Sequence, residues 1–431
     1  MPESKRAILI TGSRAPCALA LARTLHAAGF QVYTADSLRP NLCSGSGVVE
    51  ADFHLPSPRF NPAACADELA RLVAVYSIDA LIPTCEEIYH LAAERHRLPA
   101  SLNCFFPPLA TLDRLHNKHS CMELAQQLGI RIPPTTLLTS PADLDRANLE
   151  VDAVLKRVYS RFSSHVLRLQ VTPAEQRRAA TKRMVEDSSQ WIHQQYIEGH
   201  SVCSYSLCSA GRVIHHTAYA TPYTVGLGAG IYYQSVPASP SLRVAERLAA
   251  ATSFTGQLSL DFMENEEGLW LLECNPRATM GLALAAGDAE FARAWEGVLN
   301  RSGHIHCPFE APPAAAQADY IPMTPPRRRR QMALAMLFYG WKAQSPRWSL
   351  LRWAADILTT PDVLVTRADL GVAFRQMKSL ALYAYRARAL QMPVIQFTTH
   401  DIEWNGFGER RAEKAGPTAR QNLAAQASGD M

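Results

Sequence analysis

Four polar residues recur at short spacing in the segment SLDFMENEEGLWLLECNPRATMG, which covers residues 259–281. Alternating apolar residues predict two strands here, with Asp261 on the first and Glu273 and Asn275 on the second. Residues two apart share one face of a strand, and carboxylate and amide oxygens suit magnesium. Asp261, Glu273 and Asn275 are therefore a candidate metal site, and the guanidinium of Arg277 suits a phosphate. The alternative is a solvated polar strand end, and the pattern by itself leaves both interpretations open.

The elements that must position these residues fall into two units. From 1 to 108, strand candidates at 7–11, 31–35 and 80–83 alternate with helix candidates at 18–28 and 65–76, which predicts a parallel α/β sheet. From 109 to 302, one helix at 112–128 precedes strand candidates with hairpin turns, which predicts an α+β unit. These strands are expected at 151–157, 190–197, 201–209, 212–221, 256–263 and 268–274.

Three further segments follow along the chain. Residues 303–326 are rich in Pro and Ala and predict a linker, and 327–407 form a C-terminal extension. Residues 408–431 are polar and rich in Ala and Gly, which predicts a disordered tail. The basic and apolar run at 327–352 favours a core helix with a solvated basic flank, and binding to a membrane surface or nucleic acid is the alternative.

The first unit offers few groups for chemistry. Its turn TGSRAP is not a GxGxxG loop, so dinucleotide binding is poorly supported. Ser13 and Arg14 occupy a strand-to-helix turn where an anion can bind. Glu86 and Glu87 follow a strand and can place a cationic amine, although a solvated helix N-terminus is the alternative interpretation.

Several motifs together resemble the ATP-grasp superfamily. LLECNPRATMG is similar to its Glu-x-Asn-Pro-Arg signature, with Cys274 in place of the usual aliphatic residue. Asn117-Lys118 resembles the family's Asp-Lys step, and Leu155-Lys156-Arg157 resembles the strand that presents a second phosphate-binding lysine. QQYIEG at 194–199 resembles the hinge that offers backbone groups to adenine.

This resemblance implies a carboxylate–amine ligase-like protein: a Rossmann-like pre-ATP-grasp domain, a two-lobed ATP-grasp fold and a C-terminal extension. It implies that Mg²⁺, or Mn²⁺ as an alternative, binds Asp261, Glu273 and Asn275, and that Arg277 and Lys156 are catalytic. The implied ATP ligands are Lys118, Lys156, Ser163 in the flap loop, and the hinge residues Gln195, Tyr196, Ile197 and Glu198.

Three positions depart from the family pattern. The flap at 160–164 is serine-rich instead of glycine-rich, and Gln195 stands where the hinge commonly has Glu. The loop at 224–234, which in the family often supplies an arginine for the substrate carboxylate, contains glycines and tyrosines but no arginine.

Composition limits the class of protein. The chain has 431 residues, 48% of them hydrophobic and 19% charged, with a net charge of +4, as expected for a folded protein of two or three units. Its ten cysteines include no CxxC pair, its N-terminus lacks a signal-peptide layout, and no apolar run reaches the roughly 18 residues that span a bilayer. We therefore expect a cytoplasmic protein with reduced thiols, no nucleic-acid partner and no transmembrane segment; a homo-oligomer is compatible with this composition.

The sequence thus predicts an ATP-dependent ligase that activates a small-molecule carboxylate as an acyl phosphate for attack by an amine. One alternative keeps the ATP site but uses a thiol or another acceptor. A second is a sensor or scaffold protein that binds ATP without turnover. A third, a dinucleotide oxidoreductase, depends only on the first sheet.

Overall fold

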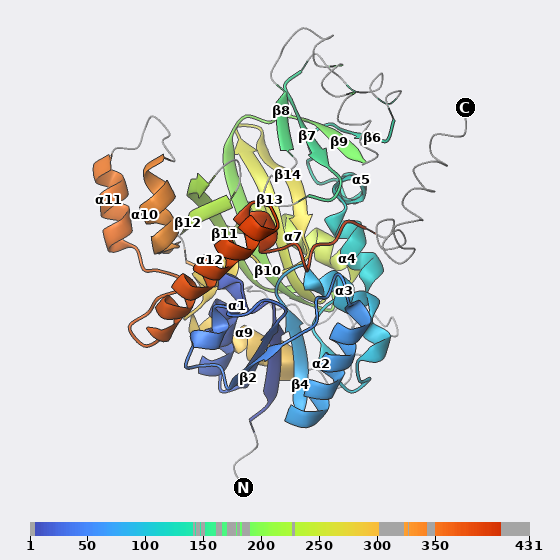
Figure 1. The fold of residues 1–431 in the computed structure, drawn as a ribbon. Coiled ribbons are helices and arrows are strands. Elements are labelled where there is room, and N and C mark those ends of the chain that lie inside the picture. The colour runs from blue at the N-terminus through green and yellow to red at the C-terminus, as the bar shows by residue number, and fades with distance from the viewer. Residues whose placement is uncertain are drawn as a thin grey trace.

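The computed structural model describes residues 5–140, 143, 147, 151–160, 166–169, 178, 182, 190–225, 229–300, 323–325, 327–342 and 350–406. It contains a five-stranded, a four-stranded and a six-stranded sheet (Figure 1). The predicted flap residue Ser163, most of the linker 303–326 and the tail 408–431 lie outside these residues.

The N-terminal unit is the predicted parallel sheet, in the order β3-β2-β1-β4-β5. Its strands are β1 (Ala7–Thr11), β2 (Gln31–Asp36), β3 (Ala51–His54), β4 (Ile78–Pro83) and β5 (Asn103–Cys104). Its helices are α1 (Pro16–Ala27), α2 (Pro62–Tyr76) and α3 (Glu87–Ala93), with short 3-10 helices η1 (Cys43–Gly45) and η2 (Arg95–Arg97).

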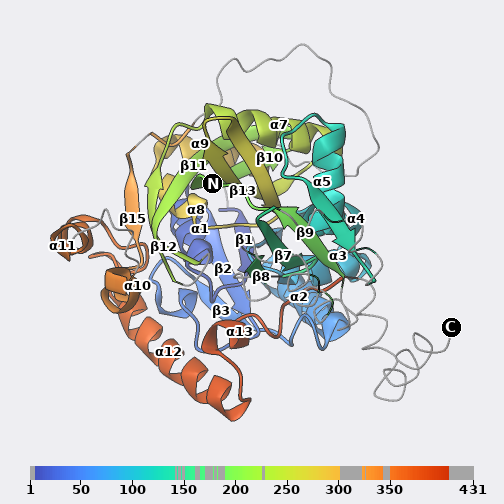
Figure 2. The same cartoon turned by 90° about the horizontal axis from the view of Figure 1, so that it is seen from above.

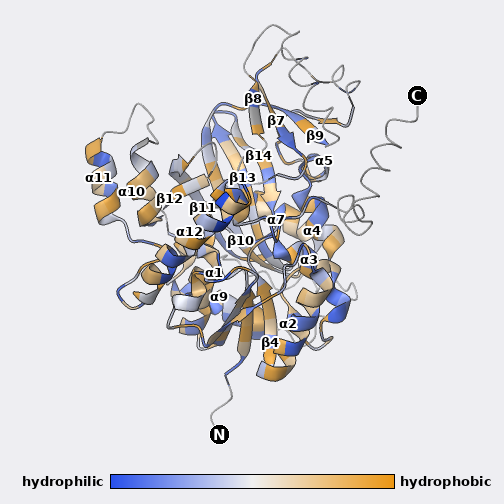
Figure 3. Ribbon diagram, viewed as in Figure 1, coloured by the Kyte–Doolittle hydropathy of each residue, from blue (hydrophilic) through white to orange (hydrophobic). Residues whose placement is uncertain are grey.

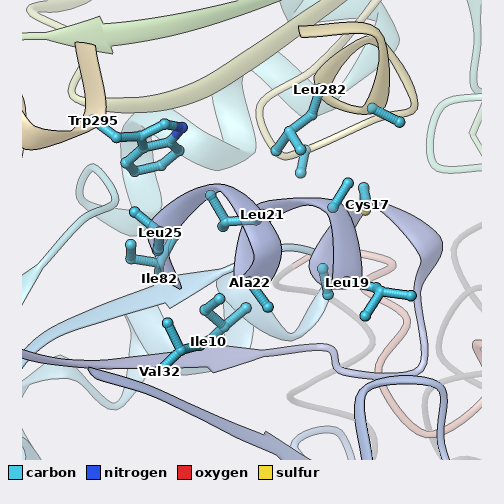
Figure 4. Packing of buried hydrophobic residues seen from close by; sticks show 14 of the residues in the cluster. Ile10, Cys17, Leu19, Leu21, Ala22, Leu25, Val32, Ile82, Leu282 and Trp295 are labelled. Carbon is cyan, nitrogen blue, oxygen red and sulfur yellow. The ribbon is translucent and has the colours of Figure 1, made fainter. Parts of the chain in front are cut away.

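Helix α1 joins this unit to the rest of the molecule. Its Leu21 and Leu25 are fully buried in one cluster with Ile10 of β1 and with Leu282 and Trp295 from later in the chain. Figure 4 shows the helix between the first sheet on one side and Leu282 and Trp295 on the other. The N-terminal unit therefore shares a core with the second unit, which fixes how the two are placed.

Two helices follow, although the sequence predicts one helix over 112–128. α4 (Leu109–His116) and α5 (Lys118–Gln127) are separated at Asn117, whose backbone is extended. The side chain of Asn117 accepts hydrogen bonds from the amides of His119 and Ser120, each at 3.0 Å. The single-helix prediction is wrong because this N-cap favours a new helix start over continuation.

The second unit has two antiparallel sheets. The small sheet, in the order β6-β9-β7-β8, contains β6 (Thr135–Leu138), β7 (Ala153–Arg157), β8 (Val166–Leu169) and β9 (Trp191–Gln195). The large sheet runs β14-β13-β10-β11-β12-β15, and Figure 2 shows it above the N-terminal sheet. Its strands are β10 (His200–Ser209), β11 (Arg212–Val225), β12 (Ala229–Ser235), β13 (Gly256–Asn265), β14 (Gly268–Asn275) and β15 (Arg329–Gln331). Its helices are α7 (Ser239–Thr252), α8 (Gly281–Ala285) and α9 (Ala289–Asn300).

The C-terminal region contains α10 (Ala333–Tyr339), η4 (Gly340–Lys342), α11 (Leu350–Thr359), α12 (Gly371–Ala389) and α13 (Val394–Phe397). It is attached to both earlier units. β15 pairs with β12 at the edge of the large sheet, and the carboxylate of Asp401 binds Arg14 in the N-terminal unit. No described helix is long and apolar enough to cross a membrane.

The prediction of a core helix in 327–352 is wrong. Of α10 only Met336 is buried, while Leu337 and Phe338 are 51% and 59% exposed. Met336 packs with Tyr223 and Tyr232 of the large sheet, and the opposite side of this short helix faces solvent. Hydrophobic residues consequently remain on projecting helices (Figure 3).

A buried histidine gives the fold a pH dependence. Nδ1 of His216 lies 2.8 Å from Ser206 Oγ, and Nε2 lies 2.9 Å from Ser241 Oγ on α7. Burial, with a smaller contribution from His215, lowers the pKa of His216 from 6.5 to about 3. In the folded protein His216 therefore stays neutral at pH values at which the unfolded chain takes up a proton.

We expect the free energy of unfolding to fall as pH decreases from 6.5 towards 3, since only the unfolded state gains the His216 proton in this window. Urea denaturation at a series of pH values measures this slope. The variant His216→Gln, which cannot titrate, should show a shallower decline. Identical slopes in the two proteins would contradict the assignment.

Candidate functional site

The predicted metal ligands meet on the large sheet. Asp261 of β13 pairs directly with Glu273 of β14, and the register shifts immediately after this pair, so that Phe262 pairs with Leu271. Such bulges re-aim side chains next to functional sites. Asn275 donates a hydrogen bond of 3.0 Å from Nδ2 to Asp261 Oδ2. Two carboxylates and an amide therefore face one point, as the spacing predicted.

Two lysines approach this point from other elements. Lys118, the first residue of α5, has its Nζ 3.3 Å from Glu273 Oε2 and donates to the backbone oxygen of Ser160 at 3.1 Å. Lys156 of β7 donates from Nζ to Gln194 Oε1 at 3.0 Å. Helix α5 packs against both β14 and β6, so it carries Lys118 into the space between the two sheets.

Burial and charge together set the electrostatics of this cluster. Burial, with the neighbouring Glu273 carboxylate, raises the pKa of Asp261. For Glu273 burial acts in the same direction, but the ammonium groups of Lys118 and Lys156 outweigh it and lower the pKa. Burial also lowers the pKa of Lys156, against the attraction of Glu273. Two cations and two carboxyl groups thus share one enclosed site, where an added anion or cation changes every protonation equilibrium.

The donor set fits magnesium. Asp261, Glu273 and Asn275 supply hard oxygen atoms, and magnesium in phosphate-transfer sites commonly takes one or two carboxylates and leaves other positions to phosphate oxygens and water. Among the described residues there is no cluster of three or more His, Cys, Asp or Glu side chains for a metal ion.

The hinge at 194–199 connects the small and large sheets. The amides of Gln195 and Tyr196 donate to the backbone oxygens of Pro134 and Asp152 at 2.9 and 2.8 Å, which fixes the end of the inner strand β9. The Tyr196 ring lies under the guanidinium of Arg168. Gly199 has no room for a side chain, since a Cβ would lie 2.3 Å from the backbone oxygen of Glu264. The structure therefore explains the hinge glycine by the close approach of β13.

Arg277 links the metal-ligand strand to the N-terminal unit. It donates to Asn275 Oδ1 at 3.2 Å, and its guanidinium lies 3.9 Å from Glu86 Oε1. Glu86 follows β4, at the carboxyl edge of the parallel sheet, where ligands of α/β folds commonly bind. The N-terminal unit therefore contributes a carboxylate to one side of the site.

Two predictions for the N-terminal unit are wrong. Glu87 does not face a substrate: its Oε1 accepts from Thr11 Oγ1 at 2.9 Å and from the amides of Thr84 and Cys85. This carboxylate is buried because it closes the turn after β4. Arg14 does not serve an anion site either, since Asp36 and Asp401 already neutralise its buried guanidinium.

Two functional candidates escaped sequence reasoning. Gln194 holds Lys156 and is itself oriented by Thr135, whose Oγ1 accepts from Nε2 at 3.1 Å. Arg330 of β15 pairs with Tyr233, which is two residues from Ser235, the partner of Tyr219. Only the strand register finds these residues, because Arg330 lies in a different segment from the loop in which an arginine was expected.

The register places Arg330 on the face of the large sheet that carries Asp261. Asp261 pairs with Cys203, Cys203 pairs with Tyr219, and Tyr219 pairs with Ser235. Paired residues lie on the same face of a sheet, and so do residues two apart on one strand. Tyr233 and its partner Arg330 therefore share the face of Asp261. Burial lowers the pKa of Arg330. Its Nη1 donates a hydrogen bond of 3.0 Å to the backbone oxygen of Arg329. This face of the large sheet therefore carries the guanidinium of Arg330 in addition to Tyr219 and Tyr233.

Comparison with known proteins was informative only at the level of structure. No protein-family model matches the chain, and no curated protein matches its sequence. Its structure is similar to N5-carboxyaminoimidazole synthetase from Staphylococcus aureus, with a TM-score of 0.55 and 12% identity over 69% of this chain and 78% of that one. It is also similar to L-amino acid ligase from Bacillus licheniformis, with a TM-score of 0.53 and 16% identity over 68% and 74% of the two chains.

A third similar structure is the biotin carboxylase domain dimer of 2-oxoglutarate carboxylase from Hydrogenobacter thermophilus. The TM-score is 0.53 and the identity 13%, over 68% of this chain and 69% of that one. The chain has an ATP-grasp-like fold. This ATP-grasp-like fold confirms the predicted fold class, with its parallel N-terminal sheet followed by two antiparallel sheets. The Hydrogenobacter structure is a complex with MgADP, ADP and bicarbonate.

The N-cap at Asn117 provides a test of how Lys118 is positioned. Asn117→Ala removes the acceptor for two helix amides, and losing such a cap costs about 1 kcal/mol. We expect a lower unfolding temperature and weaker ADP binding by titration calorimetry. Asn117→Asp keeps the acceptor and should retain both properties, whereas equal losses in the two variants would show that the cap is not the cause.

Proposed function

We propose that this protein binds Mg-ATP between its small and large sheets and ligates a carboxylate to an amine, releasing ADP and phosphate. The observation that carries the proposal is the meeting of Lys118, Lys156, Asp261 and Glu273 from separate elements. The ligases and carboxylases to which the fold is similar support the reaction class.

The two lysines are suited to a polyphosphate. Lys118 and Lys156 are both buried, and each is held by a neutral oxygen, from Ser160 and Gln194 respectively. In an enclosed site their charges are weakly screened, so they stabilise the negative charge that moves during phosphoryl transfer. A triphosphate would also reverse the effect of burial on Lys156, because a nearby anion favours the ammonium form. Hinge residues 195–198 would contact the adenine ring of the nucleotide. The side chain of Glu198 is exposed to solvent.

Asp261, Glu273 and Asn275 would hold magnesium. The ion supplies neutralisation of the phosphate charge and fixes the phosphate orientation. The protein's part is to keep two carboxylates together in a partly enclosed place. The ammonium of Lys118 holds the carboxylate of Glu273 in place, and the side-chain amide of Asn275 holds that of Asp261.

The proposed chemistry has two transfers. A carboxylate oxygen of the substrate attacks the γ-phosphorus of ATP, the bond to the β-phosphate oxygen breaks, and ADP leaves. The neutral amine then attacks the acyl carbon, phosphate leaves, and the nitrogen loses a proton to give the amide. Arg277, beside Asn275 and Glu86, would neutralise the phosphoryl group, and no covalent protein nucleophile is required.

Arg330 is our candidate for a second anionic group of the carboxylate substrate, because it lies four strands from Asp261 and so away from the reacting carboxylate. It lies on the same face as Asp261, and the loop at 224–234 has no arginine of its own. A guanidinium recognises a carboxylate by two parallel hydrogen bonds, which a tyrosine pair alone does not provide. Glu86 is buried, faces Arg277 and accepts from the amide of Trp404 at 3.2 Å, so its part would be to orient Arg277.

Release of ADP from ATP, measured with panels of carboxylates and amines, tests the proposal. We expect turnover only when both substrates are present, and at least about a hundredfold loss in Glu273→Gln and Lys156→Met. Val75→Ser, at an exposed position on α2, is the control and should retain full activity. Tight ATP binding without stimulated turnover would identify a sensor protein. Turnover with a thiol in place of the amine would show that the acceptor is a thiol.

The role of Arg330 predicts a separable kinetic effect. Arg330→Ala removes a charge-assisted contact worth about 1.5–3 kcal/mol, so kcat/KM for the carboxylate should fall roughly 10- to 150-fold. The KM for ATP should not change, because Arg330 lies four strands from Asp261. Arg329→Ala is the matched control, since Arg329 is exposed and pairs with Asp356. Equal effects of both substitutions would exclude a specific role for Arg330.

A further inference from the structure

Helices α10 and α11 project from the body of the molecule in Figure 1, and Figure 2 shows α12 along its outer edge. We call their outward side chains the apolar–basic flank. On α11, Leu351 and Leu358 are 83% and 84% exposed, and on α12 Phe374 and Tyr385 are 85% and 73% exposed. Single exposed apolar residues are ordinary, but several on each of two successive helices indicate an interaction surface.

Helix α12 is fixed so that this face points outward. On its inner side Ser379 and Tyr383 both donate hydrogen bonds to the backbone oxygen of Pro40, at 3.0 and 2.7 Å. Val372 and Ala387 complete the buried stripe at helical spacing. Phe374, Met377 and Tyr385 therefore occupy the opposite side of a helix that is firmly attached to the N-terminal unit.

Helix α11 is anchored in an equivalent way. Asp356, buried on its inner side, accepts from the hydroxyl of Tyr223 at 3.0 Å and from that of Tyr232 at 3.4 Å. Trp353 Nε1 donates to the backbone oxygen of Met336, which joins α11 to α10. The exposed leucines are therefore held outward by a buried polar attachment to β11 and β12.

The charges of this region are almost all positive. Between 327 and 400 the acidic residues are Asp356, Asp362 and Asp369. All three are engaged inward: Asp356 with the tyrosines, Asp369 with Arg23, and Asp362 with the amide of Ala333. On the outer face of α12, Lys378 is exposed one turn from Phe374, and Arg388 is exposed one turn from Tyr385. The flank thus presents apolar groups and cations without acidic groups between them.

We propose that the apolar–basic flank docks on an anionic membrane surface. Apolar side chains of a surface helix enter the boundary between headgroups and acyl chains, while lysine and arginine reach the lipid phosphates. A second copy of the chain is disfavoured, because a twofold contact would bring these cations together without acidic partners. A nucleic acid would use the cations but would leave the exposed leucines in water.

Sedimentation of the full-length protein with vesicles tests this proposal. We expect binding to vesicles of phosphatidylcholine with about one third phosphatidylglycerol, and at least about tenfold weaker binding to phosphatidylcholine alone. Raising NaCl several-fold above about 0.1 M should weaken the binding, because salt screens the cationic contribution.

Paired variants separate the two contributions. Phe374→Ser/Met377→Ser and Lys378→Glu/Arg388→Glu should each reduce vesicle binding at least about tenfold, without a change in ligase turnover or unfolding temperature. Val75→Ser removes an exposed apolar residue on α2 and should bind vesicles like the wild type.

Three results would overturn the proposal. The first is equal partitioning of the wild type onto charged and neutral vesicles, or none onto either. The second is a dimer in size-exclusion chromatography that Phe374→Ser/Met377→Ser dissociates, which would assign the flank to a second copy. The third is binding of a labelled DNA or RNA duplex under conditions in which vesicles do not bind.

Discussion

The contact between Lys118 and Glu273 is the constraint on which the candidate site depends. Lys118 begins a helix that lies between the two antiparallel sheets, and Glu273 belongs to the large sheet. The same ammonium donates to the backbone oxygen of Ser160, just after β7 of the small sheet. One buried cation therefore ties three elements together, and a buried charge is tolerated only with such partners.

The same contact explains why the charges of the site suit a nucleotide. Lys118 and Lys156 keep Glu273 ionised, whereas Asp261 is left in a position where burial favours its protonated form. Magnesium would reverse that preference, and phosphate would favour protonation of Lys156. The protonation of this cluster therefore depends on both the cations and the anions that come near it.

The position of the N-terminal unit has a different cause. Its helix α1 is covered by Leu282 and Trp295, so its core continues into the helices that follow the metal-ligand strand (Figure 4). The C-terminal segment adds Trp404, whose indole stacks on Tyr89 and donates to Asp113 at 2.8 Å. These contacts bring Glu86 to within 3.9 Å of Arg277, although the two residues are far apart in sequence.

Local patterns in the sequence were enough for nine strands and for the grouping of Asp261, Glu273 and Asn275, because alternation and close spacing act over a few residues. They did not find the strands β3, β5, β6, β8, β12 and β15. They were not enough for the break at Asn117, where a cap outweighs helical periodicity, or for Glu87, whose carboxylate the fold turns inward. Amino-acid types and their order thus determined the fold class and the candidate ligands. Only the tertiary structure decided that Gln194 holds Lys156, that Arg330 shares a face with Asp261, and that the apolar residues of α11 and α12 stay exposed. Each of these depends on contacts between segments distant in sequence, which no local pattern encodes.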